Sequence, residues 1–164
     1  MALLADGTVV QWGKAMRAYP VPAQVYNIIA ISAGVDHALA LRSDGKVLAW
    51  GANQYGQINV PADLTNAVSI AAGLQYSLVL TSDAKVIGWG TNTYGVRKIP
   101  ALLQNIVRIS AGYANSAIVL NSGNVVTLGA KEFGSLTTRT PTIKPAVFRR
   151  RFIPTTTPSY THSR

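Results

Sequence analysis

The sequence predicts an all-β protein. We expect a partial β-propeller of about three full antiparallel blades plus a leading hairpin, followed by an extended basic C-terminal tail. Two observations lead to this prediction. Short motifs recur along the chain with a period of about 39 residues, the signature of a repeat architecture. Within each period, apolar segments flank turn signals that are typical of β-hairpins.

The first repeated motif is a tryptophan followed by a glycine. Trp12, Trp50 and Trp89 are spaced by 38 and 39 residues, and Leu128 takes the tryptophan's place 39 residues later. We expect these side chains to pack between blades and the glycines to allow backbones to approach closely. An Ala-Gly pair keeps the same period, and so does an aromatic-Gly pair five residues after Trp50, Trp89 and Leu128. The predicted structural core positions are Trp12, Gly13, Trp50, Gly51, Trp89, Gly90, Gly34, Gly73 and Gly112.

Each unit also carries a hairpin signal. Ser43-Asp44-Gly45 separates two apolar runs, and the tight turns of such hairpins need residues that tolerate positive φ. Ala5-Asp6-Gly7 repeats the motif, whereas Ser82-Asp83-Ala84 lacks the glycine and Asn121-Ser122-Gly123 keeps it. A further strand is expected before each of the last three hairpins, over residues 28–32, 68–71 and 106–110. Three or four short antiparallel strands per unit are typical of one propeller blade.

Composition and charge predict two domains. With 164 residues, 48% hydrophobic and 13% charged, the chain is globular in type, and it contains no apolar run of membrane-helix length. The net charge is +9, and the residues from 133 onward hold six cations and no acid. We therefore expect repeats over residues 1–138 and a basic, Pro/Thr-rich tail over residues 139–164. No signal peptide and no membrane partner are expected, and the sequence does not indicate a compartment.

No catalytic, cofactor-binding or metal-binding residue is predicted. The chain has no cysteine, which excludes disulfides and thiolate metal sites. Asp6, Asp44 and Asp83 are expected to serve the hairpin turns. His37 is expected to make a local hydrogen bond at a loop edge, since Tyr76 and Asn115 occupy its place in the next units.

The unit from Ser43 to Gln57, with Ile70-Ala71-Ala72-Gly73 and Tyr76-Ser77-Leu78-Val79-Leu80 after it, resembles the regulator of chromosome condensation repeat. The resemblance covers residues 2–134 and implies a propeller fold used for binding. Its members include a nucleotide exchange factor that docks on chromatin and a propeller inhibitor of β-lactamases. The usual ring has seven blades, and the wedge used for exchange has no counterpart here.

An incomplete ring leaves a blade face and strand edges open, so we expect association with protein subunits. A second copy or a different subunit would cover residues 2–4, 9–11 and 125–128. In the remaining alternative, residues 146–153 pair with the first hairpin and close a small ring.

The tail holds the predicted partner-binding residues: Lys144, Phe148, Arg149, Arg150, Arg151 and Phe152. Arginines between aromatics suit either an acidic protein surface or the phosphates of RNA or DNA. The sequence therefore predicts a non-enzymatic structural or interaction subunit of a large assembly, with the repeats as platform and the tail as tether. A nucleic-acid-associated subunit and a regulatory propeller, either exchange factor or inhibitor, are the alternatives.

Overall fold

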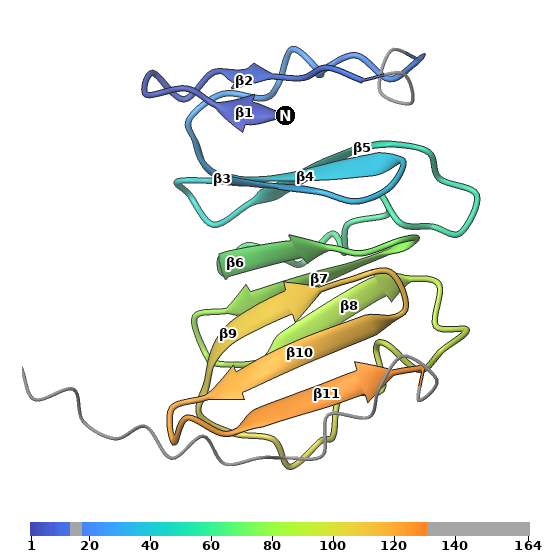
Figure 1. Ribbon diagram of the computed structural model, residues 1–164. Helices are drawn as coiled ribbons and strands as arrows, with labels where there is room; N and C mark the ends of the chain where they lie inside the picture. The colour runs from blue at the N-terminus through green and yellow to red at the C-terminus, as the bar shows by residue number, and fades with distance from the viewer. Residues whose placement is uncertain (14–17, 131–164) are drawn as a thin grey trace, which may run out of the picture.

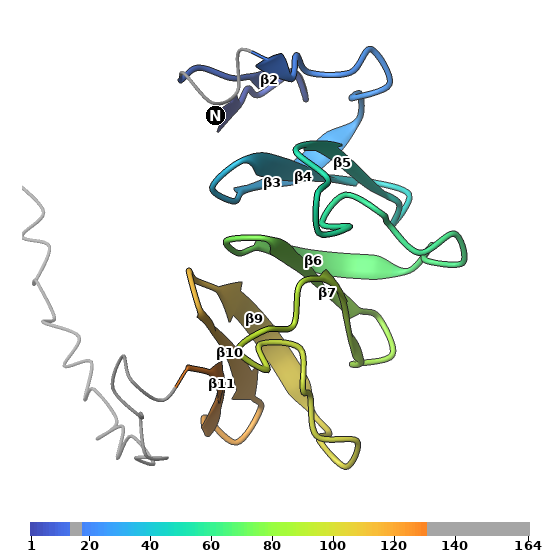
Figure 2. The same cartoon turned by 90° about the vertical axis from the view of Figure 1, so that its right-hand side faces the viewer.

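The computed structural model describes residues 1–13 and 18–130, and within them the chain is all β. Its strands form four antiparallel sheets, which we call blades 1 to 4 in chain order. Figure 1 shows the blades stacked one over the next, from the first hairpin to the orange strand β11. Seen from the side, successive blades fan out (Figure 2). The predicted partial propeller of antiparallel blades is confirmed.

Blade 1 is a hairpin, and the other three blades each have three strands in sequence order. Blade 1 contains β1 (Ala2–Leu3) and β2 (Val9–Val10); blade 2 contains β3 (Ile28–Ala33), β4 (His37–Arg42) and β5 (Val47–Gly51); blade 3 contains β6 (Ala67–Ala72), β7 (Tyr76–Thr81) and β8 (Val86–Gly90); blade 4 contains β9 (Ile106–Ala111), β10 (Asn115–Leu120) and β11 (Val125–Gly129).

The strand register repeats from blade to blade. Ala40 pairs with Leu48, Val79 with Ile87 and Ile118 with Val126, and Ala2 pairs with Val10 in the hairpin. Since successive side chains of a strand point to opposite faces, each blade has two faces. We call the face toward the preceding blade the incoming face and the face toward the following blade the outgoing face.

The glycine that ends the third strand of each blade is required by the close approach of the middle strand. Gly51 has a φ of +119°, and a Cβ added there would lie 2.4 Å from the Asp36 carbonyl oxygen. Gly90 and Gly129 repeat this arrangement, with φ values of +90° and +123°. A side chain at any of the three would displace backbone, so the Trp-Gly motif fixes the edge of the blade.

Buried tryptophans join neighbouring blades. Trp50 is 4% exposed and packs on residues of blade 1, among them Leu3 and Val9. Trp89 is 7% exposed and packs on blade 2, where Leu39 and Leu41 form part of the same cluster. Leu128 packs in the cluster between blades 3 and 4. Trp50, Trp89 and Leu128 therefore fill the space between their own blade and the blade before it.

Trp12 corrects the expectation that all three indoles are buried. Its side chain is 64% exposed, although its place in the register is that of Trp50. The physical reason is that each of the buried tryptophans packs on the blade before it, and the described residues contain no blade before the first hairpin.

The predicted open ends are corrected in a similar way. Val9 is buried against blade 2, and Val126 and Leu128 face blade 3, so only alternate residues of these strands lie on the open faces. The predicted domain boundary at residues 138 and 139, the partner-binding tail and the alternative closure through residues 146–153 lie outside the described residues.

Candidate interaction surface

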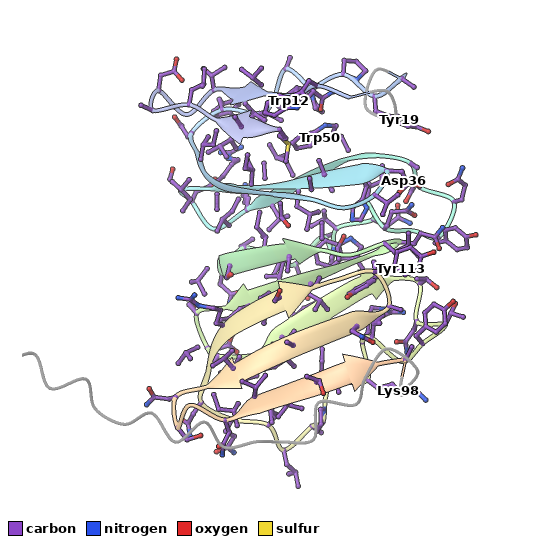
Figure 3. The ribbon with its side chains drawn as sticks, viewed as in Figure 1. Trp12, Tyr19, Asp36, Trp50, Lys98 and Tyr113 are labelled. Atoms are coloured by element: carbon purple, nitrogen blue, oxygen red, sulfur yellow. The ribbon has the colours of Figure 1, made fainter. Side chains whose placement is uncertain are left out.

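One side of the stack collects two kinds of connection between strands. It holds the turns between the first and second strands, which follow each Ala-Gly pair, and the loops after β5 and β8. Figure 3 shows Asp36, Tyr113 and Lys98 together on this side. The hairpin turns at Gly45, Ala84 and Gly123 lie at the other ends of the strands.

A repeated Asn-x-Tyr-Gly turn presents one tyrosine from each of two loops. The Asn53 side-chain oxygen accepts a hydrogen bond from the Ile58 N–H at 3.2 Å, and Gly56, at a φ of +74°, donates its N–H to the Asn53 carbonyl. Asn92 and Gly95 repeat these roles in the next loop. The turn leaves the tyrosine in its third position exposed, at 52% for Tyr55 and 47% for Tyr94.

These two tyrosines and Tyr113 line one cavity of about 320 Å³ between blades 3 and 4. Tyr113 follows Gly112 in the turn after β9 and is itself largely exposed. The cavity wall also contains the side chains of Gln75, Thr91 and Thr93. We call this cavity the tyrosine groove. Its lining offers aromatic rings, hydroxyls and one amide.

Tyr76 forms part of the groove wall and is fixed by the next blade. It is fully buried, and its hydroxyl donates a hydrogen bond to the Asn115 carbonyl oxygen at 2.7 Å. Burial raises the pKa of Tyr76 to about 12, so its hydroxyl keeps the proton that it donates. The groove is therefore built on a rigid contact between blades 3 and 4.

His37 occupies the position of Tyr76 in blade 2, and the expectation of a local hydrogen bond is wrong for it. The side chain is fully buried, and Nε2 lies 3.1 Å from the Ser77 hydroxyl of blade 3. Ser77 in turn donates to the Gln57 carbonyl at 2.8 Å, so His37 Nε2 acts as the donor to Ser77. Position 37 reaches across to the next blade because that blade packs directly on it.

The electrostatics around His37 keep it neutral. Burial lowers the pKa of His37 below its ordinary value of 6.5, against the opposing effect of the Asp36 carboxylate. The nearest Asp36 oxygen is 3.9 Å from Nδ1, too far for a hydrogen bond. The Gln57 side chain fixes the neighbouring loop, since its oxygen accepts the Tyr55 N–H at 2.9 Å.

Charged groups near the groove are few and mostly engaged in structure. The Arg97 guanidinium donates to the carbonyls of Gly88 and Thr91 at 2.9 and 3.1 Å.

Across residues 1–13 and 18–130, no three His, Asp or Glu side chains gather where they could hold a metal ion. The acids at positions 6 and 44 accept backbone N–H groups within their own turns, and Asp83 pairs with Lys85 at 2.7 Å. The described part of the chain also contains no helix long and apolar enough to cross a membrane.

Residues 28–57 and 67–96 match the family model of the regulator of chromosome condensation (RCC1) repeat. These segments span blades 2 and 3 and the loops that carry Tyr55 and Tyr94. The two blades are thus similar to RCC1 repeats.

Several solved structures resemble this chain over about two thirds of its length. Prp20p from Saccharomyces cerevisiae, studied for its binding to Gsp1p and histones, is 28% identical, with a TM-score of 0.59 over 67% of this chain and 32% of its own. The same yeast RCC1 bound to Kap60 gives 28% identity and a TM-score of 0.58 over 67% and 31%. Human WBSCR16 shares the fold at 18% identity and a TM-score of 0.55 over 62% and 33%. The chain thus spans about a third of the length of these structures, and no curated protein matches it.

The repeat pattern could have indicated some residues of the tyrosine groove but not others. Tyr55 and Tyr94 are repeat markers, and their place in an exposed turn could have been inferred from the Asn-x-Tyr-Gly pattern. Tyr113 gives no such signal because Val35 and Leu74 occupy its place in the other blades. The tail residues predicted to bind a partner, from Lys144 to Phe152, lie outside the described residues.

Proposed function

We propose that this chain is a non-enzymatic interaction subunit of a large assembly. Its RCC1 blades form a rigid platform, and residues 139–164 form a basic tether. The tyrosine groove is the observation that carries the proposal, because it is an exposed aromatic cavity built on buried contacts between blades. The yeast protein Prp20p, which resembles this chain, was studied for binding to Gsp1p and histones, and this supports a protein partner.

The composition of the groove suits a protein ligand. Tyrosine supplies a large, rigid contact area at low cost in conformational entropy, and its hydroxyl hydrogen-bonds at the rim. Gln75, Thr91 and Thr93 add neutral donors and acceptors around the rings. A segment that inserts one or two side chains into the cavity would gain apolar burial and directional hydrogen bonds together.

The charge of the tail favours one second candidate, a subunit bound to RNA or DNA. Arg149, Arg150 and Arg151 lie between Phe148 and Phe152, and residues 139–164 contain no acid. Arginine pairs with phosphate oxygens in bidentate fashion, and aromatic rings stack on bases. Such binding weakens steeply as salt concentration rises because counterions are released from the nucleic acid.

The test is incorporation of tagged variants into the native assembly. The variant Tyr55→Ala/Tyr94→Ala/Tyr113→Ala removes the groove's three exposed rings and keeps the buried Tyr76. The variant Arg149→Ser/Arg150→Ser/Arg151→Ser removes the tail's central charges. Leu102→Ser is the matched control, since Leu102 is 90% exposed and does not line the groove. We expect the first two variants to be recovered in the assembly at least tenfold less often than the control.

The two candidate functions separate in the same experiment. A protein partner of the groove is lost with the tyrosine variant and survives nuclease treatment. An RNA or DNA partner is lost on nuclease treatment, and its retention falls steeply with salt in the wild type but less so in the arginine variant. The proposal is wrong if both variants enter the assembly as the control does.

A further inference from the structure

The two ends of the blade stack differ in chemistry. The incoming face of blade 1 consists of Ala2, Leu4, Val10 and Trp12, and it is apolar and open. The exposed fractions are 45% for Leu4, 44% for Val10 and 64% for Trp12. In blade 2 the residues in register with Ala2 and Val10 are Ala40 and Leu48, and Trp50 follows Leu48 by two residues as Trp12 follows Val10; these three residues of blade 2 belong to the cluster with blade 1.

The interfaces inside the stack define what such an incoming face contacts. Against blade 3, blade 2 presents two leucines from its middle strand, Leu39 and Leu41, together with Val47 from its third strand. Blade 3 presents the equivalent Leu78, Leu80 and Val86 to blade 4. The incoming face of blade 1 is equivalent to the incoming faces that are buried in these interfaces. An outgoing face with the Leu-x-Leu pattern is therefore the surface that fits it.

A hydrogen-bond acceptor accompanies each interface that a buried tryptophan fills. The Trp50 indole N–H donates to the Gln11 side-chain oxygen at 2.9 Å, and the Trp89 indole N–H donates to the Gln57 carbonyl at 2.8 Å. In both cases the acceptor belongs to the preceding blade or the loop after it. A blade docked on Trp12 would supply the same acceptor, because a buried indole N–H without a partner is costly.

Blade 4 does not carry the pattern on its outgoing face. Ala117 stands where blades 2 and 3 have leucine, and Val119 replaces the second leucine. On the first strand, Arg108 takes the place of the small residues Ala30 and Ser69 and is exposed. This face is smaller and more polar than its counterparts, as expected for the end of a repeat stack.

The difference between the two ends disfavours a second copy of this chain as the occupant. Head-to-tail contact would leave empty space beside Ala117 and would bury the Arg108 guanidinium against an apolar face without a partner. If both ends were complementary, copies would join without closure into open filaments. Arg108 and Ala117 therefore protect the chain from self-assembly through Trp12.

We propose that the incoming face of blade 1 is a docking site for one further RCC1-type blade that residues 1–13 and 18–130 do not contain, and that blade 4 ends the stack of described blades. The docked blade presents a Leu-x-Leu middle strand and an acceptor for the Trp12 indole. This surface shares no residue with the tyrosine groove or with residues 139–164, so its test is independent of the proposed function.

The experiment changes the outgoing face of blade 4 so that it resembles that of blade 3. Blade 4 of one copy of the chain can then dock on blade 1 of another copy, and self-association measures the docking. The variant Arg108→Ser/Ala117→Leu/Val119→Leu is compared with wild type by sedimentation equilibrium. We expect the dissociation constant for self-association to fall at least tenfold in the variant. Adding Trp12→Gln should restore the wild-type value, whereas adding Leu102→Gln, at an exposed position away from both faces, should leave the tighter association unchanged.

Circular dichroism and thermal unfolding establish that each variant is folded. A milder variant, Arg108→Ser/Val119→Leu, adds a single methylene and should still lower the dissociation constant about threefold, given the energy of burying one such group. The proposal is overturned if folded variants associate no more tightly than wild type or if Trp12→Gln leaves their association unchanged. Wild-type association that Trp12→Gln abolishes would also overturn it, because blade 4 would then not end the stack.

Discussion

At position 89 the tryptophan side chain packs on a preceding blade, and at position 12 the same side chain lies in solvent. Both belong to the same motif, and both are followed by a glycine at positive φ. The contribution of each indole to stability therefore depends on its neighbour and not on its motif.

Replacing Trp89 by alanine should lower the free energy of unfolding by about 3–5 kcal/mol, because the truncation leaves a cavity between blades 2 and 3. Trp12→Ala should change it by about 0.5 kcal/mol or less, since the side chain is exposed. Urea denaturation of both variants measures the difference. Equal losses at the two positions would contradict the burial of Trp89.

The sequence could predict that the three tryptophans hold equivalent positions in their repeats, and the strand pairing agrees for Trp50, opposite Ala38, and Trp89, opposite Ser77. It could not predict that Trp12 is exposed, because the repeat pattern describes a blade and burial depends on the blade beside it. His37 is a similar case. Its partner Ser77 is 40 residues away, and a contact between blades leaves no mark in the sequence near position 37.

His37 should make stability depend on pH. Because its pKa is lowered in the folded protein, the unfolded chain takes up the proton first as the pH falls below 6.5. The stabilisation is complete above that value and is lost progressively toward the folded pKa, with a slope of at most about 1.4 kcal/mol per pH unit. Urea unfolding between pH 8 and 5 measures this loss.

His37→Gln is the control for the pH series. Its stability should vary less across the same window, and since His162 is present in both proteins, the difference reports on position 37. Parallel pH profiles for the two proteins would show that position 37 contributes nothing to the pH dependence.

Among the elements, the hairpin turns were the most predictable. The Asp-Gly pattern predicts positive φ at the turn, and Gly7 and Gly45 have values of +81° and +80°. The strand before each of the last three hairpins was also predicted. Its predicted bounds were one residue short at the C-terminal end for β3 and β9 and at both ends for β6. The tyrosine groove was not predicted, because it combines loops of two units with a turn of a third, and their approach follows from the stacking.

Ala84 is the exception among the turns. It holds the position of Gly45 at a φ of 58°, a conformation that costs an L-residue roughly 1–2 kcal/mol. Ala84→Gly should therefore raise the free energy of unfolding by about 0.5–1 kcal/mol, after the greater entropy of glycine in the unfolded chain is subtracted. Thermal unfolding measures this gain.

Gly45→Ala is the matched reverse change. A Cβ at position 45 would lie 2.5 Å from the Thr65 carbonyl oxygen, so we expect a loss larger than the gain at position 84. If Ala84→Gly destabilised the protein instead, the side chain at position 84 would be making a contact that outweighs the backbone strain.

For the whole molecule, the period predicted the number of blades and their order, since each unit became one sheet. The expectation that other chains cover the open ends stays a prediction. The structure distinguishes the two open ends, because the incoming face of blade 1 is apolar whereas the outgoing face of blade 4 carries the exposed Arg108. Such a difference arises from a few substitutions inside otherwise regular strands, and it can be recognised once the strand faces are assigned.

The packing between adjacent blades has a further consequence for how the molecule opens. Each core cluster joins one blade to the next, so cooperativity passes from neighbour to neighbour, as in other linear repeat arrays. Local opening should begin at the ends and spread inward. Hydrogen exchange should then be fastest at the amides of β1 and β2 and slowest at those of β7, which has a blade on either side. Mass spectrometry of exchanged peptides would reveal this gradient, and uniform protection along the stack would instead mean that the blades unfold as one unit.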